Sequence, residues 1–195
     1  MTPDTAGRAP PAWRAIEART RALGFDMASD ERTGALLATL AATKPGGRLL
    51  ELGSGTGLAT AWLLAGMDEA SRLTSVDVDE TVLSVAREEL GGDPRVTFVL
   101  ADALEVLRHA APGSFDLIFA DAIPGKYAGL DLAVGRLAPG GLYIGDDMLP
   151  QPNWPEDHPP KVERLLAELD RRGELTLVRM SWSTGIVIAS RLPAP

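Results

Sequence analysis

Residues 48–60 read Arg-Leu-Leu-Glu-Leu-Gly-Ser-Gly-Thr-Gly-Leu-Ala-Thr, and this stretch decides the fold. The apolar run from Arg48 to Leu52 predicts a short buried strand of a parallel sheet. Three glycines at alternate positions follow, and glycine allows positive φ angles and a close approach of a ligand to the backbone. The alanine- and leucine-rich residues 58–65 then favour a helix. A strand, a glycine loop and a helix in this order predict a small-molecule site at the carboxyl end of the strand.

The spacing of the glycines indicates which small molecule binds there. A dinucleotide-binding loop has the pattern Gly-x-Gly-x-x-Gly, which would require glycine where this chain has Leu58. Glu51 would repel a pyrophosphate, whereas it suits the cationic amino-acid end of S-adenosylmethionine (SAM). Asp77 follows the glycines by about twenty residues, where a carboxylate can accept hydrogen bonds from both ribose hydroxyls. We therefore interpret the stretch as a SAM site, with a nicotinamide-linked oxidoreductase as the alternative.

The composition limits the class of protein. The chain has 195 residues, which is enough for one α/β domain with a sizeable core. A formal net charge of −8 argues against a nucleic-acid groove, and the absence of cysteine excludes disulfides, thiolate metal sites and a cysteine nucleophile. No apolar stretch reaches the roughly 20 residues that span a bilayer, and the first residues lack a signal-peptide pattern. We expect a cytoplasmic enzyme with a small-molecule partner and no nucleic-acid or membrane partner, and we leave a homodimer open.

The patterns along the chain predict one domain. Residues 1–12 are expected to be a disordered leader, residues 13–44 two helices, and residues 45–195 a Rossmann-like core. Within that core strand and helix patterns alternate, and strands are expected near residues 48–52, 73–78, 96–100, 115–120, 142–145, 175–180 and 185–190. We predict an α/β fold with a doubly wound seven-stranded sheet, mostly parallel and ending in an antiparallel hairpin.

Acidic residues follow all five of the predicted parallel strands. They are Glu51, Asp77, Asp102, Asp121 and the pair Asp146-Asp147. Any one of them could be an ordinary turn or helix-cap carboxylate, which is common at such positions. Because the carboxyl ends of parallel strands meet at one edge of a sheet, however, the whole set predicts a site at that edge.

From Met27 onward the chain resembles the small O-methyltransferases related to catechol and caffeoyl-CoA methyltransferases, within the class I SAM-dependent methyltransferases. The segment before the first strand is similar at residues 27–34, and the first SAM motif at residues 50–57. The ribose-binding motif corresponds to residues 76–79 and the adenine-side motif to residues 100–105. Residues 115–121 and 139–147 resemble the two strands that supply metal ligands in this subgroup.

The resemblance implies roles for individual residues. SAM would be held by Met27, Glu51, Gly53, Ser54, Gly55, Gly57, Asp77, Val78, Asp102, Ala103 and Asp121. Asp121, Asp146 and Asp147 would bind a divalent cation such as Mg²⁺, Mn²⁺ or Ca²⁺, and Asp121 would thereby serve catalysis. That cation would bind two neighbouring oxygens of a catechol-like acceptor and lower the pKa of its hydroxyl.

The chain departs from the family pattern at two positions. Asp147 stands where the family usually has asparagine, and Pro124 stands where it has the lysine that acts as general base. Lys126 and His158 are therefore the candidates for the base. Two alternatives stay open because of these departures: a metal-independent methyltransferase, and a SAM-binding domain without turnover.

The segment after the fifth strand is expected to form an irregular loop. Residues 149–160 contain five prolines together with Trp154 and His158. Because the loop leaves the sheet at the predicted catalytic edge, we expect residues 148–160 to close over the methyl acceptor.

Overall fold

The structure is a computed structural model, and it describes residues 7–152 and 154–193. Residues 1–6, half of the predicted leader, lie outside this range. Within its described part Pro10 is buried, and Ala9 and Ala12 pack against the core. The carbonyl of Pro10 accepts a hydrogen bond of 3.0 Å from the backbone N–H of Trp13, where the first helix begins.

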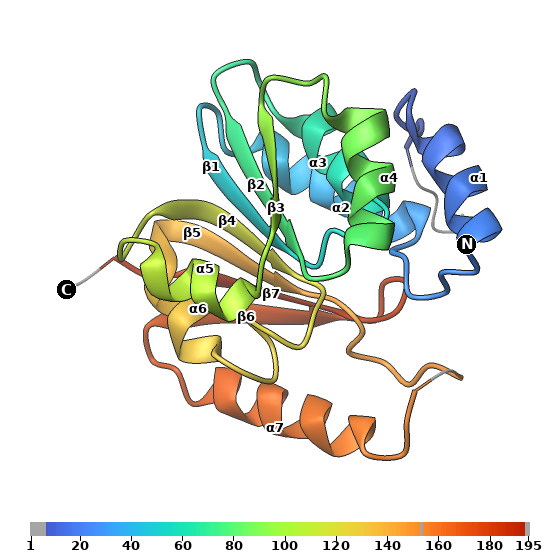
Figure 1. The fold of residues 1–195 in the computed structure, drawn as a ribbon. Coiled ribbons are helices and arrows are strands. Elements are labelled where there is room, and N and C mark those ends of the chain that lie inside the picture. The colour runs from blue at the N-terminus through green and yellow to red at the C-terminus, as the bar shows by residue number, and fades with distance from the viewer. Residues whose placement is uncertain (1–6, 153, 194–195) are drawn as a thin grey trace.

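The sheet has seven strands in the order β3-β2-β1-β4-β5-β7-β6 (Figure 1). β1 to β5 run parallel to one another, and β7 pairs antiparallel with both β5 and β6. The predicted fold class is thus confirmed, including the closing hairpin. The strands are β1 (Arg48–Leu52), β2 (Arg72–Asp77), β3 (Val96–Leu100), β4 (Phe115–Ala120), β5 (Leu137–Gly145), β6 (Leu175–Met180) and β7 (Ile186–Arg191).

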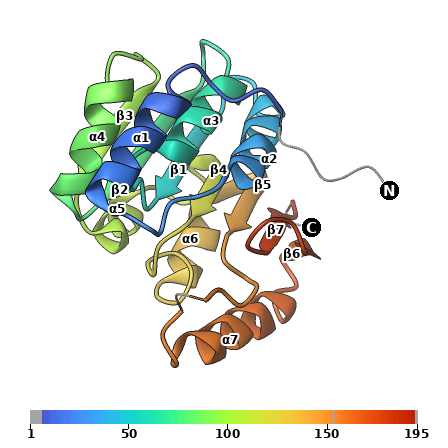
Figure 2. The same ribbon diagram turned by 90° about the vertical axis from the view of Figure 1, so that its right-hand side faces the viewer.

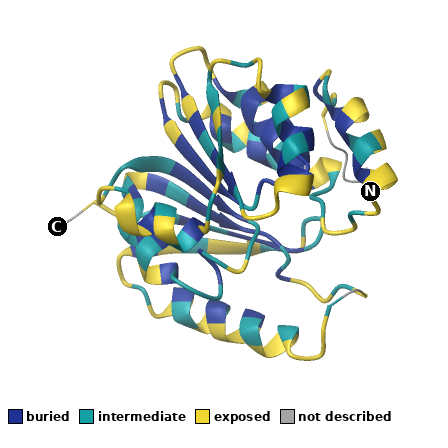
Figure 3. Cartoon of the chain, viewed as in Figure 1, coloured by how far each residue is buried: buried dark blue, intermediate teal, exposed yellow. Residues whose placement is uncertain are grey.

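Helices cover both faces of the sheet (Figures 1 and 2). The first face packs against α1 (Trp13–Leu23), α2 (Glu31–Ala42), α3 (Leu58–Gly66) and α4 (Glu80–Leu90). The other face packs against α5 (Ala103–His109), α6 (Leu130–Arg136) and α7 (His158–Asp170). Consecutive strand residues point to opposite faces, so Leu49 joins the first core and Leu50 the second. Figure 3 shows the central strands buried between these two layers. None of the described helices is long and apolar enough to cross a membrane.

Asp30 caps α2 by accepting hydrogen bonds from the backbone N–H groups of Arg32 and Thr33. The structure shifts two of the predicted boundaries. β5 begins at Leu137 rather than near residue 142, and its register shifts there. α7 begins at His158, inside the expected loop. Proline is compatible with that start, because the first N–H groups of a helix have no partner within the helix.

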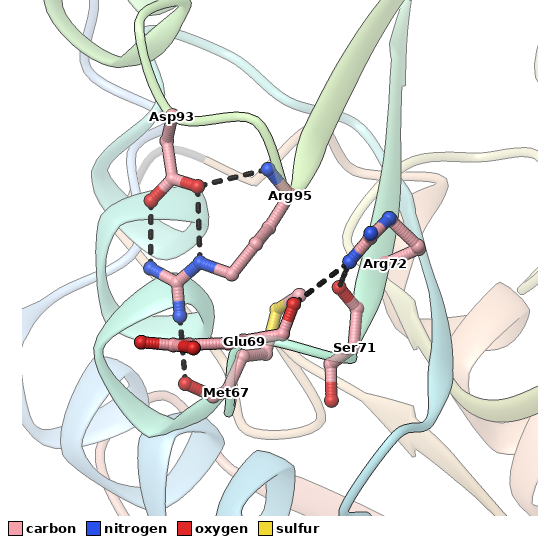
Figure 4. Close-up of polar contacts among 6 residues, drawn as sticks. All are labelled: Met67, Glu69, Ser71, Arg72, Asp93 and Arg95. Atoms are coloured by element: carbon pink, nitrogen blue, oxygen red, sulfur yellow. Dashed lines mark hydrogen bonds and ion pairs between the residues drawn. The ribbon is translucent and has the colours of Figure 1, made fainter.

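Charge pairs fix the end of the sheet that faces away from the glycine loop (Figure 4). The guanidinium of Arg95, just before β3, donates to both carboxylate oxygens of Asp93 at 3.0 and 2.6 Å. It also donates to the backbone oxygen of Met67 at 2.7 Å, across the start of β2. Arg72, the first residue of β2, donates to the backbone oxygens of Glu69 and Ser71. These bonds tie the α3–β2 turn to the start of β3.

Candidate functional site

A cavity of about 650 Å³ lies at the carboxyl ends of the parallel strands. The glycine loop and the end of β2 form one side of it, and the segments after β4 and β5 form the other. Its lining contains most of the residues predicted for SAM, for catalysis and for the metal: Met27, Gly53, Ser54, Gly55, Asp77, Val78, Asp121, Lys126, Asp146, Asp147 and His158. These side chains therefore lie together at the carboxyl edge of the sheet, where the sequence predicted a site.

The glycine loop has the geometry that its sequence predicts. Gly53, Gly55 and Gly57 have φ angles of 98°, 51° and 93°, a region in which other residues are strained. At Gly57 an added Cβ would lie 2.9 Å from the Cβ of Ala86, so glycine is also required for α3 and α4 to pack. At Gly55 a Cβ would lie 3.1 Å from the ring of Phe25. The loop therefore presents bare backbone to the cavity.

Asp77, at the end of β2, lies beside this loop. Its Oδ2 accepts a hydrogen bond of 2.8 Å from the backbone N–H of Gly55, and its Oδ1 accepts one of 3.0 Å from that of Asp79. Each carboxylate oxygen has a second lone pair, so Asp77 can still accept two hydroxyl hydrogen bonds. The side chains of Val78 and Met27 are about 70% exposed at the cavity and offer it an apolar edge. This arrangement fits a ribose and an adenine.

The sequence suggests that Glu51 faces the ligand, but the structure places its side chain inside the protein. It is fully buried, and its Oε2 accepts hydrogen bonds from the hydroxyls of Thr60 and Ser75. Among the described residues it is not part of the cavity lining, and its Oε1 has no partner. Burial raises the pKa of Glu51 to about 7, against the two hydroxyl hydrogen bonds, which lower it. An attraction between a Glu51 carboxylate and the SAM ammonium stays a prediction, because the acid lies behind the loop.

Three other predicted cofactor residues also lie outside the described lining. Gly57 shapes the loop without facing the cavity, Asp102 caps α5 by accepting from the backbone N–H of Leu104, and Ala103 is buried in the second core. Their contacts with SAM stay predictions.

Lys126 and the predicted metal ligands come together in the structure. Asp121, after β4, accepts a hydrogen bond of 2.9 Å at Oδ2 from the hydroxyl of Ser29. Its Oδ1 lies 3.8 Å from the Nζ of Lys126, a side chain that is only 4% exposed. The same Nζ donates to the backbone oxygen of Asp146 at 3.1 Å. Lys126 therefore joins the ends of β4 and β5.

The carboxyl groups of Asp121 and Asp146 have raised pKa values. Burial raises the pKa of Asp121 well above its usual value; the positive charge of Lys126 acts in the opposite direction, and Asp146 and Asp147 raise the pKa further. Burial, followed by the charge of Asp147, raises the pKa of Asp146 to about 6. Such shifts are expected where like charges share a dry site, and they are concentrated at functional sites.

The donor set does not fit the predicted metal centre. Oδ1 of Asp146 accepts from the hydroxyl of Thr184 and, at 2.7 Å, from the backbone N–H of Asp147. Oδ1 of Asp121 faces an ammonium and its Oδ2 a hydroxyl. In the part of the chain that the structure describes, no group of three acidic or histidine side chains is arranged to hold a metal ion. Both carboxylate oxygens of Asp121 and Oδ1 of Asp146 are thus directed toward protein donors.

His158 lies on the acceptor side of the cavity. Its Nε2 is 3.1 Å from the hydroxyl of Tyr127, and its ring centroid is 4.3 Å from that of Trp154. Burial, and then the charge of Lys126, lower the pKa of His158, which favours the neutral imidazole. Residue 153 of the predicted loop lies outside the described residues. Trp154 lines the cavity, and closure of the loop over an acceptor stays a prediction.

Sequence reasoning did not identify Ser29, Tyr127 and Thr184 as site residues. Each contacts a predicted site residue through a hydroxyl: Ser29 with Asp121, Tyr127 with His158, and Thr184 with Asp146. Only Tyr127 carried a signal, because it directly follows the candidate base Lys126.

Comparison with known proteins decides the family. The family described as "Methyltransferase domain" matches residues 50–148, a range that contains the glycine loop, Asp77 and the acidic group around Lys126. The chain belongs to this family. The methyltransferase domain is 38% identical over 112 residues to a putative O-methyltransferase from Mycobacterium ulcerans, which covers 55% of this chain and 50% of that protein. The chain therefore spans about half the length of the curated relatives it matches.

Solved structures agree with the fold of this methyltransferase domain. A putative O-methyltransferase from Klebsiella pneumoniae superposes with a TM-score of 0.81 at 25% identity, covering 95% of this chain and 92% of that one. The O-methyltransferase TomG from Streptomyces achromogenes, solved in complex with SAM, superposes with a TM-score of 0.80 at 22% identity and covers 95% and 92%. The resemblance inferred from the sequence motifs is confirmed at the level of family and fold.

Proposed function

We propose that this methyltransferase domain transfers the methyl group of SAM to a hydroxyl oxygen of a small molecule. One observation carries the proposal: a single cavity is lined on one side by Gly53, Gly55 and Asp77, and on the other by Lys126 and His158. The first side fits a nucleoside and the second offers groups that can handle a hydroxyl proton. The SAM complex of TomG, a structure with this fold, supports the choice of cofactor.

SAM supplies an activated methyl group on its sulfonium when it is bound. The acceptor oxygen forms a bond to the methyl carbon, the carbon–sulfur bond breaks with its electron pair left on sulfur, and the hydroxyl proton passes to Nε2 of His158. The lowered pKa of His158 keeps this nitrogen free to accept a proton near neutral pH. Tyr127, whose hydroxyl meets that nitrogen, orients the ring until the acceptor arrives. Because methyl transfer needs an in-line approach, positioning by the cavity supplies most of the rate.

The acceptor is a small hydroxylated aromatic molecule in this proposal. Trp154 and His158 stack at 4.3 Å between ring centroids, and Tyr127 meets His158 edge-on at 5.2 Å. Aromatic faces at these separations favour a planar apolar ligand. The resemblance further suggests a catechol-like acceptor, a cytoplasmic location and the absence of nucleic-acid and membrane partners. Those statements stay predictions, as does a homodimer.

Calorimetry tests the cofactor and product release tests the reaction. We expect SAM and S-adenosylhomocysteine to bind the wild-type chain, and NAD to give no heat. A coupled assay for S-adenosylhomocysteine, run over a panel of phenols and catechols, should then identify an acceptor. The rate with it should rise with pH as His158 loses its proton, with a midpoint below the ordinary histidine pKa of about 6.5, and His158→Gln should remove this dependence.

Two results would contradict this function. Binding of NAD without SAM would favour the oxidoreductase. SAM binding without product, for every acceptor of the panel, would favour a binding domain without turnover.

A further inference from the structure

We propose that the ammonium of Lys126 takes the place that the family resemblance gives to a divalent cation, so that this domain transfers its methyl group without a metal. The inference rests on the proposed function for the reaction itself. It rests on contacts of the described residues for the role of Lys126.

The position of Lys126 between two strand ends is the first argument. Its side chain is almost completely buried, at 4% exposure, and its Nζ lies 3.8 Å from Oδ1 of Asp121 and 3.1 Å from the backbone oxygen of Asp146. A buried ammonium is costly unless a carboxylate pairs with it. Asp121 provides that carboxylate, and Lys126 in turn provides the positive charge that the acidic group needs. The two charges thus hold each other at the site where the cation was expected.

The turn after β4 explains why this lysine points inward. Gly125 has a φ of 84°, and an added Cβ would lie 2.4 Å from Cδ1 of the buried Leu52. Its carbonyl accepts a hydrogen bond of 2.9 Å from the hydroxyl of Tyr143, and its N–H donates to the backbone oxygen of Ala128 at 2.8 Å. This tight turn packs its backbone against the core and directs the next side chain, that of Lys126, into the cavity.

Two more oxygens of the acidic group, Oδ2 of Asp121 and Oδ1 of Asp146, accept hydrogen bonds from protein donors. Ser29 donates to Asp121, and Thr184 and the backbone N–H of Asp147 donate to Asp146. Mg²⁺ prefers about six oxygen ligands at roughly 2.0–2.1 Å. It would have to displace the ammonium of Lys126 and break several of these hydrogen bonds. Protein groups therefore already contact both oxygens of Asp121 and Oδ1 of Asp146, where the metal was expected.

This substitution has a consequence for the acceptor. An ammonium has three N–H donors, and here one is used by the carbonyl of Asp146 and one faces Asp121. Lys126 therefore has one donor left for one acceptor oxygen, whereas a divalent cation binds two neighbouring oxygens. We infer that the acceptor class is a molecule with a single reacting hydroxyl, for which a second, adjacent hydroxyl gives no advantage.

Mn²⁺ binding tests the inference without an acceptor. Free Mn²⁺ gives a strong paramagnetic resonance signal that binding removes, and we expect the wild-type chain to leave this signal unchanged. Lys126→Ala removes the ammonium and opens its space, so Mn²⁺ should bind at least about tenfold more tightly than the detection limit that the wild type sets. Lys126→Met removes the same charge but fills the space, so it should bind Mn²⁺ more tightly than wild type and less tightly than Lys126→Ala. Lys44→Ala is the control, because it removes a lysine that contacts the exposed carbonyl of Gly140, far from the site.

Clear Mn²⁺ binding by the wild type would overturn the inference. It would also be overturned if Lys126→Ala, shown by circular dichroism to be folded, bound Mn²⁺ no better than wild type. With the acceptor from the panel of phenols, turnover should be the same in excess chelator as in Mg²⁺, and loss in chelator with recovery in Mg²⁺ would count against it. A failure of SAM to bind in calorimetry would instead contradict the proposed function, and the Mn²⁺ comparison would still decide the role of Lys126.

Discussion

The pKa values of acidic residues shift in opposite directions at the two ends of the parallel sheet. At the amino end, Arg95 pairs with Asp93 at 2.6 Å, and both side chains stay about one-quarter exposed (Figure 4). The hydrogen bonds from Arg95 hold the pKa of Asp93 below its usual value. At the carboxyl end, burial raises the pKa of Asp121 and Asp146, and the nearest lysine lies 3.8 Å from Asp121. At one end hydrogen bonds stabilise the charged form, and at the other burial opposes it, with Lys126 acting against that burial.

The difference separates stability from function within one sheet. The bonds of Arg95 link a strand start to the turn before a neighbouring strand, which is a structural role. The carboxyl end of the sheet has three carboxylates, Asp121, Asp146 and Asp147, around Lys126. A protein selected only for stability would pair each buried carboxylate or replace it. Such uncompensated burial is tolerated where a ligand with positive charge, such as a sulfonium, completes the site. The following predictions test this contrast.

The largest effect is expected from removing the buried lysine. Lys126→Met should lower the free energy of unfolding by about 3 kcal/mol, at the lower end of the range for breaking a buried pair, because Asp121 can take up a proton. Arg95→Met, at the amino end, should cost about 1 kcal/mol, since its pair is partly exposed. Urea unfolding at neutral pH measures both. Equal losses of unfolding free energy in the two variants would show that the buried pair contributes no more to stability than the partly exposed one.

The next effect concerns the pH dependence of stability. Glu51 has a pKa of about 7 in the folded chain and 4.5 as its reference, so the folded chain holds a proton that the unfolded chain releases between these values. Its contribution is complete below pH 4.5 and is lost as the pH rises through 7. Relative to Glu51→Gln, the wild type should therefore lose up to about 3 kcal/mol between these limits.

Unfolding of both proteins in urea at acid and at mildly alkaline pH checks this expectation. Glu163→Gln changes an exposed glutamate on α7 and is the matched control. Wild-type stability that rises over this interval relative to Glu51→Gln would contradict a protonated Glu51.

A smaller effect is expected for cofactor affinity. Asp77→Asn keeps an oxygen for the N–H of Gly55 but removes the charge that would accept the ribose hydroxyls. SAM binding should weaken by about 1.5–3 kcal/mol, which is roughly tenfold to more than a hundredfold in Kd. Asp68→Asn, at the amino end, changes a carboxylate that accepts from Gly46 and Ser71 and should leave SAM affinity unchanged. Calorimetry that found equal affinities for both variants would remove Asp77 from the SAM site.

The smallest effect is expected on the acceptor side. Trp154→Ala removes the ring that stacks on His158, and an aromatic pair of this kind contributes about 0.5–1.5 kcal/mol. The KM for the acceptor should rise by up to about tenfold, while the Kd for SAM stays the same. Steady-state kinetics with unchanged KM and kcat would reduce the loop before α7 to a structural connection.

Local patterns in the sequence determined the architecture and the cofactor loop. The apolar run at 48–52, the spaced glycines and the acidic residue after each strand are short-range features, and the φ angles of Gly53, Gly55 and Gly57 agree with them. The closing hairpin followed from two adjacent strand patterns. These features depend on residues close in sequence, which is why they could be predicted.

Only the tertiary structure decided which charges meet. Ser29 bonds Asp121 across 92 positions, Thr184 bonds Asp146 across 38, and Lys126 reaches the carbonyl of Asp146 across 20. No periodicity encodes these contacts, because they depend on where separate strand ends and turns meet in space. Likewise the acid of Glu51 was visible, but its position behind the loop depends on Thr60 of α3 and Ser75 of β2. Sequence named the ionisable groups, and burial and packing set which of them carry charge.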